Sequence, residues 1–423
     1  MRVTLSPLPR QRGFGLMEVL VGLVIGFIAV LVIYQVYTVS EGYKRNTTAL
    51  GEAQQTGLYS TFVVGLDLAN AGAGMVVESP NLASCLDPGG AMPMRYGKFY
   101  RPLPVVVADS GDPNIPDTFV LAYSSATTLN SAAPFTAASA AANPFQIQSP
   151  GGFHANDLVV AISTPGSPQG IAPCPTSKVT AVALTNDNVG DVIITQTPVD
   201  PPGGIDLTDA ALLLNLGPCN RVQKVMYALK QPPPVDNNPV TWNNLPNCNS
   251  GSPCSLYAKP LLDTSAGANC GKPVDLAANP IATNVVNMKV QYGINAPGDP
   301  KGVLNTWVPA KATPNNGDWT WTTMMDNAML ITQINQIRAV RIGIIVQSEQ
   351  FDKTINSTYT AGNYLNGAYN WVLFDCADVV KANCPGRLTG SIPLQSVPVE
   401  GNWRFRTYET VIPLRSAIWQ HFF

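Results

Sequence analysis

The chain has 423 residues, a formal net charge of −2 and only 12% charged residues. This balance gives no electrostatic basis for nucleic-acid binding, and so little charge is unusual for a cytosolic protein. Hydrophobic residues make up 45% of the chain, enough for a large core, and 35 glycines and 37 prolines indicate many turns. The composition favours a turn-rich, β-rich protein that lies outside the cytosol.

The first predicted element is a membrane span behind a basic leader. The leader carries Arg2, Arg10 and Arg12 and no acid, which keeps that end of a membrane protein in the cytoplasm. Residues 19–40 hold no charge, close to the ~20 residues that cross a bilayer. A secretory signal peptide would have a shorter apolar region and a cleavage site of small residues, whereas a plain uncleaved anchor fits the length.

One acid, Glu18, lies at the start of this span, and a plain anchor does not explain it. A carboxylate deep in a bilayer costs roughly 2.5–3.5 kcal/mol, which marks Glu18 as a candidate functional residue. The residues around it, GFGLMEVL, resemble the N-terminal motif of the type IV prepilin family. In that family a prepilin peptidase cuts after a glycine, the next residue becomes the N-methylated N-terminus, and a glutamate is the fifth mature residue.

The resemblance places cleavage between Gly13 and Phe14 and N-methylation on Phe14. It implies that Glu18 pairs with the ammonium at Phe14, in its own or a neighbouring subunit, and sets the register of each subunit in a filament. Such a pair is strong in a low dielectric, and leaving one charge unpaired is unfavourable. Gly22 and Gly26 form a GxxxG pattern, which indicates either close helix packing or the ordinary glycine content of membrane helices.

After the span the chain turns polar but stays compatible with a helix up to NAGAG at 70–74. Apolar residues recur at helical spacing and predict a stripe that packs on the protein's own sheet. The stripe consists of Leu50, Leu58, Phe62, Leu66 and Ala69. The expected division is a leader at 1–13, the transmembrane half of the helix at 14–40, its amphipathic half at 41–74 and a globular head at 75–423. Many pilins have a proline late in this helix, and none is present here.

Beyond residue 75 the sequence predicts a β-rich head. Runs of β-branched and aromatic residues alternate with turn-rich segments, and no repeat with a fixed period appears. The runs lie at 117–125, 156–164, 177–185, 191–197, 221–230, 284–294, 337–348 and 403–414. The Ala-, Ser- and Asn-rich stretch at 127–144 is typical of a surface loop.

Three late segments, VVNMKVQYGINAPGD, QIRAVRIGIIVQS and WRFRTYETVIPLRS, resemble in order the closing strands of PilW-like minor pilins. The resemblance implies an α+β type IV pilin fold, in which a long N-terminal helix packs on an antiparallel sheet with an enlarged, disulfide-bonded head. It also implies a subunit that primes pilus assembly at or near the tip, with roles in adhesion and twitching motility. The implied location is the inner membrane, with a cytoplasmic N-terminus and a periplasmic head, and then the pilus surface.

The resemblance further implies four kinds of partner: other minor pilins, the major pilin, the prepilin peptidase and a PilY-type tip adhesin. Two other functions stay open, a large pseudopilin of type II secretion and a tip module that binds a surface or an adhesin. Motifs such as HExxH, GxSxG and the Walker loop are missing, so the sequence favours a structural protein over an enzyme. We expect no cofactor and no nucleic-acid partner.

The cysteines favour disulfides over a zinc site. All eight follow the apolar span, none forms CxxC, and their spacings fit no common zinc pattern. They are Cys85, Cys174, Cys219, Cys248, Cys254, Cys270, Cys376 and Cys384. Proximity in sequence favours the pairs Cys248–Cys254 and Cys376–Cys384.

No metal site is expected from the remaining polar residues. The chain has only two histidines, His154 and His421, and both are interpreted as ordinary surface or packing residues. Acid-rich turns at 108–114, 186–191 and 296–302 offer oxygens that suit calcium. None matches an EF-hand loop, and Asp, Asn and Gly are common turn residues, so the sequence favours plain turns.

Overall fold

The computed structural model describes residues 15–73 and most of residues 103–414. Within the second range it does not describe 125–131, 136–144, 149–151, 164–175, 185–191, 201–209, 233–241, 243–244, 249–252, 266, 268, 272–277, 296–303, 305, 314–316, 327–335, 353–354, 356–358, 377–383, 385 and 395–401. The chain forms two compact units, Met1–Glu52 and Ala53–Phe423.

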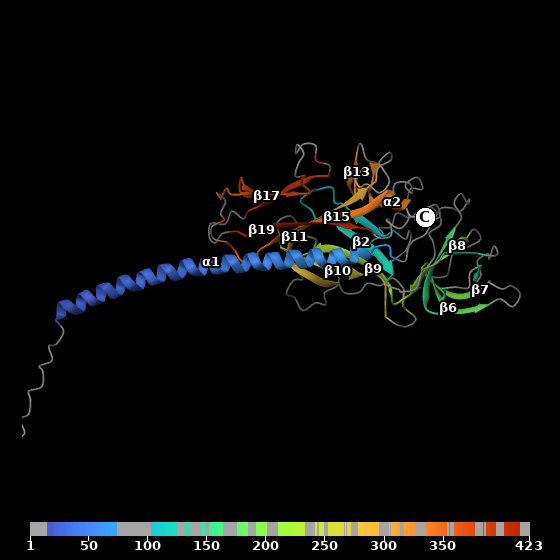
Figure 1. Ribbon diagram of the computed structural model, residues 1–423, viewed down its shortest axis with the longest axis horizontal. Coiled ribbons are helices and arrows are strands. Elements are labelled where there is room, and N and C mark those ends of the chain that lie inside the picture. Colours follow the sequence, from blue (N-terminus) through green and yellow to red (C-terminus); the bar gives the residue numbers. More distant parts are fainter. Residues whose placement is uncertain are drawn as a thin grey trace, which may run out of the picture. The chain divides into compact units, whose positions relative to one another are not determined.

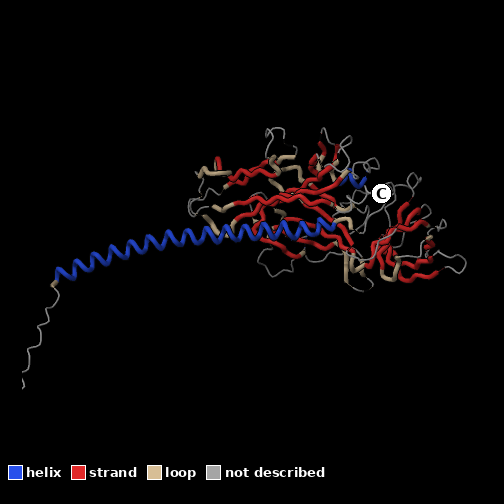
Figure 2. Tube along the Cα trace, viewed as in Figure 1, coloured by secondary structure: helices blue, strands red, loops and turns tan. Residues whose placement is uncertain are grey.

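The first element is a single long helix, α1 (Leu16–Asn70, 55 residues), which Figures 1 and 2 show without interruption. Its first part is long and apolar enough to cross a membrane, and none of the most apolar window is buried. The large side chains from Leu16 to Val39 are all exposed. The helix ends where the sequence predicts, just before glycine-rich turns. The predicted boundaries at residues 13, 40 and 74 stay predictions.

The head contains an eight-stranded antiparallel sheet in the order β1-β2-β9-β10-β11-β15-β19, with β12 beside β11. The strands are β1 (Val105–Ala108), β2 (Thr118–Ser124), β9 (Val222–Lys230), β10 (Cys254–Pro260), β11 (Asn279–Ile294), β12 (Thr306–Pro309), β15 (Ile337–Gln347) and β19 (Phe405–Pro413). The sheet centre is most regular between β11 and β15, where Met288 pairs with Ile344. Both strands are rich in β-branched residues, which fit a pleated, buried surface.

Three smaller sheets and one short helix complete the described part of the head. A six-stranded sheet has the order β3-β8-β5-β6-β7-β4, a three-stranded sheet has β16-β17-β18, and β13 pairs with β14. The elements are β3 (Ala132–Pro134), β4 (Phe145–Ile147), β5 (Asp157–Ser163), β6 (Thr176–Leu184), β7 (Val192–Asp200), β8 (Ala210–Pro218), β13 (Ala312–Thr313), β14 (Gly317–Asp318), α2 (Trp321–Asp326), β16 (Tyr364–Leu365), β17 (Ala368–Leu373) and β18 (Leu388–Pro393).

All eight predicted β runs are strands, which confirms the β-rich head. The expectation of a loop at 127–144 is wrong at residues 132–134. These residues form β3, where Ala133 is buried and pairs with Leu213 of β8. Alanine and proline carry little strand propensity, so the pairing comes from the neighbouring leucine-rich strand rather than from the local sequence.

The face of α1 that packs on the main sheet shares Ala69 with the predicted stripe but is otherwise formed by other residues. Ala53, Val64 and Leu68 are almost completely buried against the sheet. The predicted contacts Leu58 and Phe62 are 61% and 67% exposed, and Leu66 is also exposed. The prediction failed because residues 53–66 are apolar on both sides of the helix, so periodicity alone did not identify the inner side.

The helix approaches β19 closely at Gly57. A Cβ added at this position would overlap the ring of Tyr408, whereas at Gly51 it would meet nothing within 4 Å.

We expect Gly57→Ala to destabilise the head by about 1–3 kcal/mol, since the ring must shift out of a packed position. Chemical unfolding of the full chain in detergent measures this. The control Gly51→Ala should be stabilising by about 0.5–1 kcal/mol, because glycine is a poor helix former. Equal effects at both positions would contradict the close approach.

Three disulfides link described cysteines: Cys219–Cys270, Cys248–Cys254 and Cys376–Cys384. The two short pairs are those that proximity in sequence favours. No cysteine in the described part of the chain is free. Cys85 and Cys174 lie outside the described residues.

Candidate assembly site

The start of α1 presents Glu18 to the surroundings. The carbonyl of Gly15 accepts hydrogen bonds from the N–H groups of Glu18 at 2.9 Å and Val19 at 3.2 Å, which forms the first turn. Glu18 is the acidic residue of this turn, where the helix dipole favours a negative charge. Its side chain is exposed. Gly13 and Phe14 lie just before the described residues, so their proposed roles stay predictions.

The two glycines of the GxxxG pattern leave the helix backbone uncovered on the span. A Cβ built at Gly22 or at Gly26 would meet nothing within 4 Å. No described residue of this chain therefore packs on them. Their role in packing stays a prediction, and a second helix would have close access to the backbone here.

A second uncovered surface lies further along the same helix, in the part that belongs to the head. We call Leu58, Tyr59, Phe62 and Leu66 the outer face of α1. All four side chains are more than half exposed. No charged residue occurs between Ala53 and Leu66. An apolar, uncharged helix face of this kind marks an interaction site rather than an ordinary solvent-facing surface.

Asp67 fixes the rotation of the helix and so determines which face points outward. Its Oδ1 accepts a hydrogen bond from the hydroxyl of Tyr123 at 3.1 Å, and its Oδ2 accepts one from Tyr227 at 2.5 Å. Burial, and then the nearby Asp67 charge, raise the pKa of both tyrosines, so both stay donors. Phe119 stacks on Tyr227 with ring centroids 5.1 Å apart. Sequence reasoning missed Asp67, since one acid on a helix carries no pattern.

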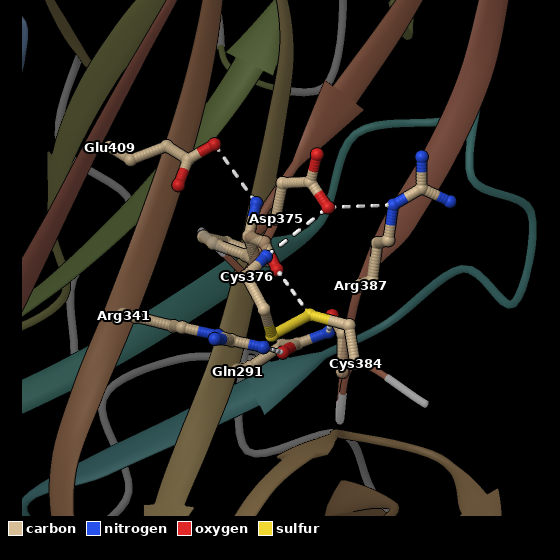
Figure 3. The surroundings of a disulfide bond; sticks show 9 residues. Gln291, Arg341, Asp375, Cys376, Cys384, Arg387 and Glu409 are labelled. Carbon is tan, nitrogen blue, oxygen red and sulfur yellow. Dashed lines mark hydrogen bonds and ion pairs between the residues drawn. A yellow bond between two sulfur atoms is a disulfide. The ribbon is translucent and has the colours of Figure 1, made fainter. Parts of the chain in front are cut away.

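The buried side chain of Arg341 packs between two aromatic rings beside a disulfide (Figure 3). The Arg341 guanidinium lies 4.5 Å from the ring of Trp307 and 4.3 Å from that of Phe374. Its Nε and Nη2 donate to Oε1 of Gln291 at 2.9 and 2.6 Å. Burial lowers the pKa of Arg341 to about 10, and Glu409 opposes this shift. The cluster is fully engaged in packing and holds the strands together near Cys376–Cys384.

The turn residues considered for metal binding serve the structure. The backbone N–H of His154 and Nδ2 of Asn215 donate to Oδ2 of Asp157 at 2.7 and 2.9 Å, while the His154 side chain is largely exposed. The turn at 108–114 faces the ammonium of Lys289: Asp109 Oδ1 lies 3.9 Å from its Nζ, and the backbone carbonyl of Asp112 accepts a hydrogen bond from it at 2.9 Å. Within the described ranges no three His, Cys, Asp or Glu side chains gather to hold a metal. His421 and the turns at 186–191 and 296–302 lie outside the described residues.

Comparisons with known proteins match two segments of the chain, its N-terminal segment and the later strands of the head. A model described as prokaryotic N-terminal methylation motif matches residues 8–34, and one described as type IV pilus-assembly protein W matches residues 250–416. The chain is a PilW-like member of the type IV prepilin family. The first match contains Glu18 and the GxxxG pattern, and the second contains the strands from β10 to β19.

The PilW-like chain has the α+β type IV pilin fold, with a long N-terminal helix, an antiparallel sheet and an enlarged, disulfide-bonded head. A solved structure of a type IV-like pilin from Thermus thermophilus is similar at 10% identity over 62% of this chain and 85% of that one, with a TM-score of 0.20. A likeness that low adds nothing to the assignment. No curated protein matched. Membership in a family of structural pilins implies contact with other pilins and with the prepilin peptidase.

Proposed function

We propose that this PilW-like chain is a minor pilin that primes pilus assembly and sits at or near the filament tip. The observation that carries the proposal is the uncovered apolar surface of α1, because such a surface is useful only when another helix covers it. The second unit contains residues 53–423. A head of that size is difficult to repeat around a narrow filament core, which favours a few copies at one end.

The proposed life cycle follows from the N-terminal segment. The chain is inserted in the inner membrane with the basic leader in the cytoplasm and the head in the periplasm. The prepilin peptidase then removes residues 1–13, and Phe14 is methylated. Residues 14–40 form the membrane and filament segment, residues 41–74 continue the helix into the head, and residues 75–423 form the remainder of the head.

Two other roles compete with this one. A pseudopilin of type II secretion would share the same helix, but the match of residues 250–416 to a pilus-assembly model favours the pilus. A tip module that holds a PilY-type adhesin is compatible with priming, since both place the head at the end of the filament.

The outer face of α1 is suited to a second helix in particular. Leu58, Phe62 and Leu66 are spaced four residues apart and so form one ridge along the helix. Ridges of this spacing pack into the grooves of a neighbouring helix. The partner must be uncharged along the contact, since this face offers no counter-charge. An apolar helix of another pilin subunit has that chemistry.

We expect Phe62→Asp to reduce the amount of the chain in isolated pili by more than about tenfold. A carboxylate buried without a partner costs several kcal/mol, and 1.4 kcal/mol corresponds to about a factor of ten. Quantitative mass spectrometry of purified filaments, normalised to the major pilin, measures the effect. The unfolding midpoint of the variant should stay unchanged, because Phe62 faces away from the core.

Two control variants make this test specific. Phe62→Leu keeps the face apolar and should be incorporated normally. Leu365→Asp adds the same charge at an exposed apolar residue of β16, outside α1, and it should also be incorporated normally. Native incorporation of Phe62→Asp would show that α1 does not contact a partner through this face.

A further inference from the structure

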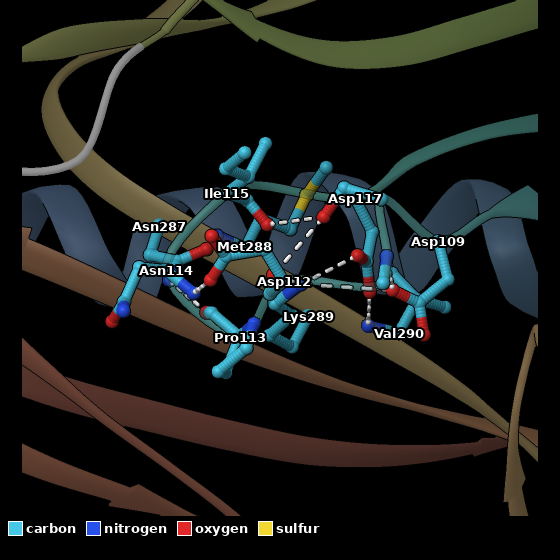
Figure 4. A network of polar contacts seen from close by, with 12 residues as sticks. Asp109, Asp112, Pro113, Asn114, Ile115, Asp117, Asn287, Met288, Lys289 and Val290 are labelled. Atoms are coloured by element: carbon cyan, nitrogen blue, oxygen red, sulfur yellow. Dashed lines mark hydrogen bonds and ion pairs between the residues drawn. The ribbon is translucent and has the colours of Figure 1, made fainter.

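A lysine and an aspartate are buried together beside β11 (Figure 4). Lys289 Nζ lies 2.7 Å from Asp117 Oδ1, and the two side chains are only 2% and 1% exposed. The segment before β2 lies along β11: the N–H of Asp117 donates to the carbonyl of Met288 at 2.8 Å, and Asn287 Nδ2 donates to the carbonyl of Pro113 at 2.9 Å. The backbone thus holds the amine and the carboxyl in contact.

The other groups around this pair match what amide formation requires. The N–H of Val290 donates to Asp117 Oδ2 at 3.0 Å, where negative charge develops if the carboxyl carbon is attacked. The carbonyl of Asp112 accepts a hydrogen bond from Lys289 Nζ at 2.9 Å and orients it. A second carboxylate, Asp109, has Oδ1 at 3.9 Å from the same nitrogen and is mostly buried. At this distance Asp109 is just beyond hydrogen-bond reach, and a small side-chain movement would let it relay a proton.

Burial also favours the uncharged form of the Asp117 carboxyl. An ionised carboxylate is costly to remove from water, so this group holds a proton more readily here than in solvent. Burial raises the pKa of Asp117 to about 7, against the opposing charge of Lys289. A neutral amine is a nucleophile and a protonated carboxyl is an electrophile, whereas the ion pair is neither.

We propose that Lys289 and Asp117 form an intramolecular isopeptide bond. A bond forms between Lys289 Nζ and the side-chain carboxyl carbon of Asp117, and one C–O bond of that carboxyl breaks. The leaving oxygen takes two of the three ammonium protons and departs as water, with Asp109 carrying a proton from the nitrogen to the oxygen. The reaction involves no oxidation or reduction and no co-reactant. The product joins the segment before β2 to β11 covalently.

The test is the mass of the full-length chain, purified in detergent and fully reduced. After correction for the N-terminus found by sequencing and for any methylation there, the mass should be one water below the sequence mass. Trypsin should fail to cut after Lys289 and should release a branched peptide that contains Asp117. Lys289→Arg keeps a positive charge beside Asp117 but should restore the full mass. Asp109→Asn keeps both reacting groups and should leave at least about half of the chains unlinked, since the proton relay is lost.

The mass of the native chain decides the proposal, whether or not a variant folds. A native chain at full mass, with normal tryptic cleavage after Lys289, would overturn it and leave a buried ion pair. A water loss that persists in Lys289→Arg would overturn the assignment to this pair. Pilus incorporation plays no part in either readout, so the result is independent of the proposed function.

Discussion

A chain with Glu18→Ala is expected to be inserted and cleaved normally, with Phe14 at its N-terminus, but to enter filaments at least about tenfold less often than the native chain. In the proposed life cycle, cleavage creates an ammonium at Phe14 in an apolar setting, and Glu18 is the only acid between that residue and Glu41. Without it the ammonium is buried with no counter-charge, which costs several kcal/mol.

The measurement is the same normalised mass spectrometry of purified pili, together with sequencing of the N-terminus. Val21→Ala, a similar truncation at an exposed apolar position of the same helix, serves as the matched control and should be incorporated normally. Glu18→Gln separates charge from size and should fail as Glu18→Ala does. If both Glu18 variants were incorporated at the native level, charge pairing would have no role in assembly.

Loss of the Cys219–Cys270 disulfide is expected to destabilise the head by about 4 kcal/mol, because among the three described bonds it closes the longest loop and so restricts the unfolded chain most. The two cysteines are 51 residues apart, whereas Cys376 and Cys384 are 8 apart. The same loop-entropy argument gives about 2.5 kcal/mol for the shorter loop.

Paired Cys→Ala substitutions, compared by chemical unfolding under oxidising conditions, measure both effects. Alanine is chosen over serine because Cys219 and Cys270 pack in a core with Leu158 and Leu214, where a serine hydroxyl would be buried. The Cys376→Ala/Cys384→Ala chain is the internal control for cysteine removal as such. A larger loss for the short loop than for the long one would contradict the entropic account.

Local sequence predicted the helix and many strands, because their signals are local. β11 and β15 carry dense β-branched residues, and the end of α1 is marked by glycines. β8, with the sequence AALLLNLGP, was not predicted, since a leucine run without alternation fits a helix as well as a strand. β10 was missed because it is short and begins at a cysteine.

The candidate sites also differ in whether their signal is local in the sequence. The N-terminal motif is a contiguous pattern, so Gly13, Phe14 and Glu18 were predicted from sequence alone. Lys289 and Asp117 meet across 172 residues of chain, and no spacing rule brings them together. The outer face of α1 was visible as an apolar stripe, but its direction depends on Asp67 meeting two tyrosines from different strands.

The nesting of two disulfides has a consequence for how the chain matures. Along the chain the four cysteines occur in the order Cys219, Cys248, Cys254 and Cys270, and the bond between the middle two lies inside the loop that the outer two close. An oxidase that joins cysteines in the order in which they emerge would couple Cys219 to Cys248 and leave Cys254 for Cys270. The native pairing therefore requires either that β9 and β10 come together before oxidation or that an isomerase reshuffles the first bonds, which makes pilin maturation depend on thiol exchange in the compartment where the head folds.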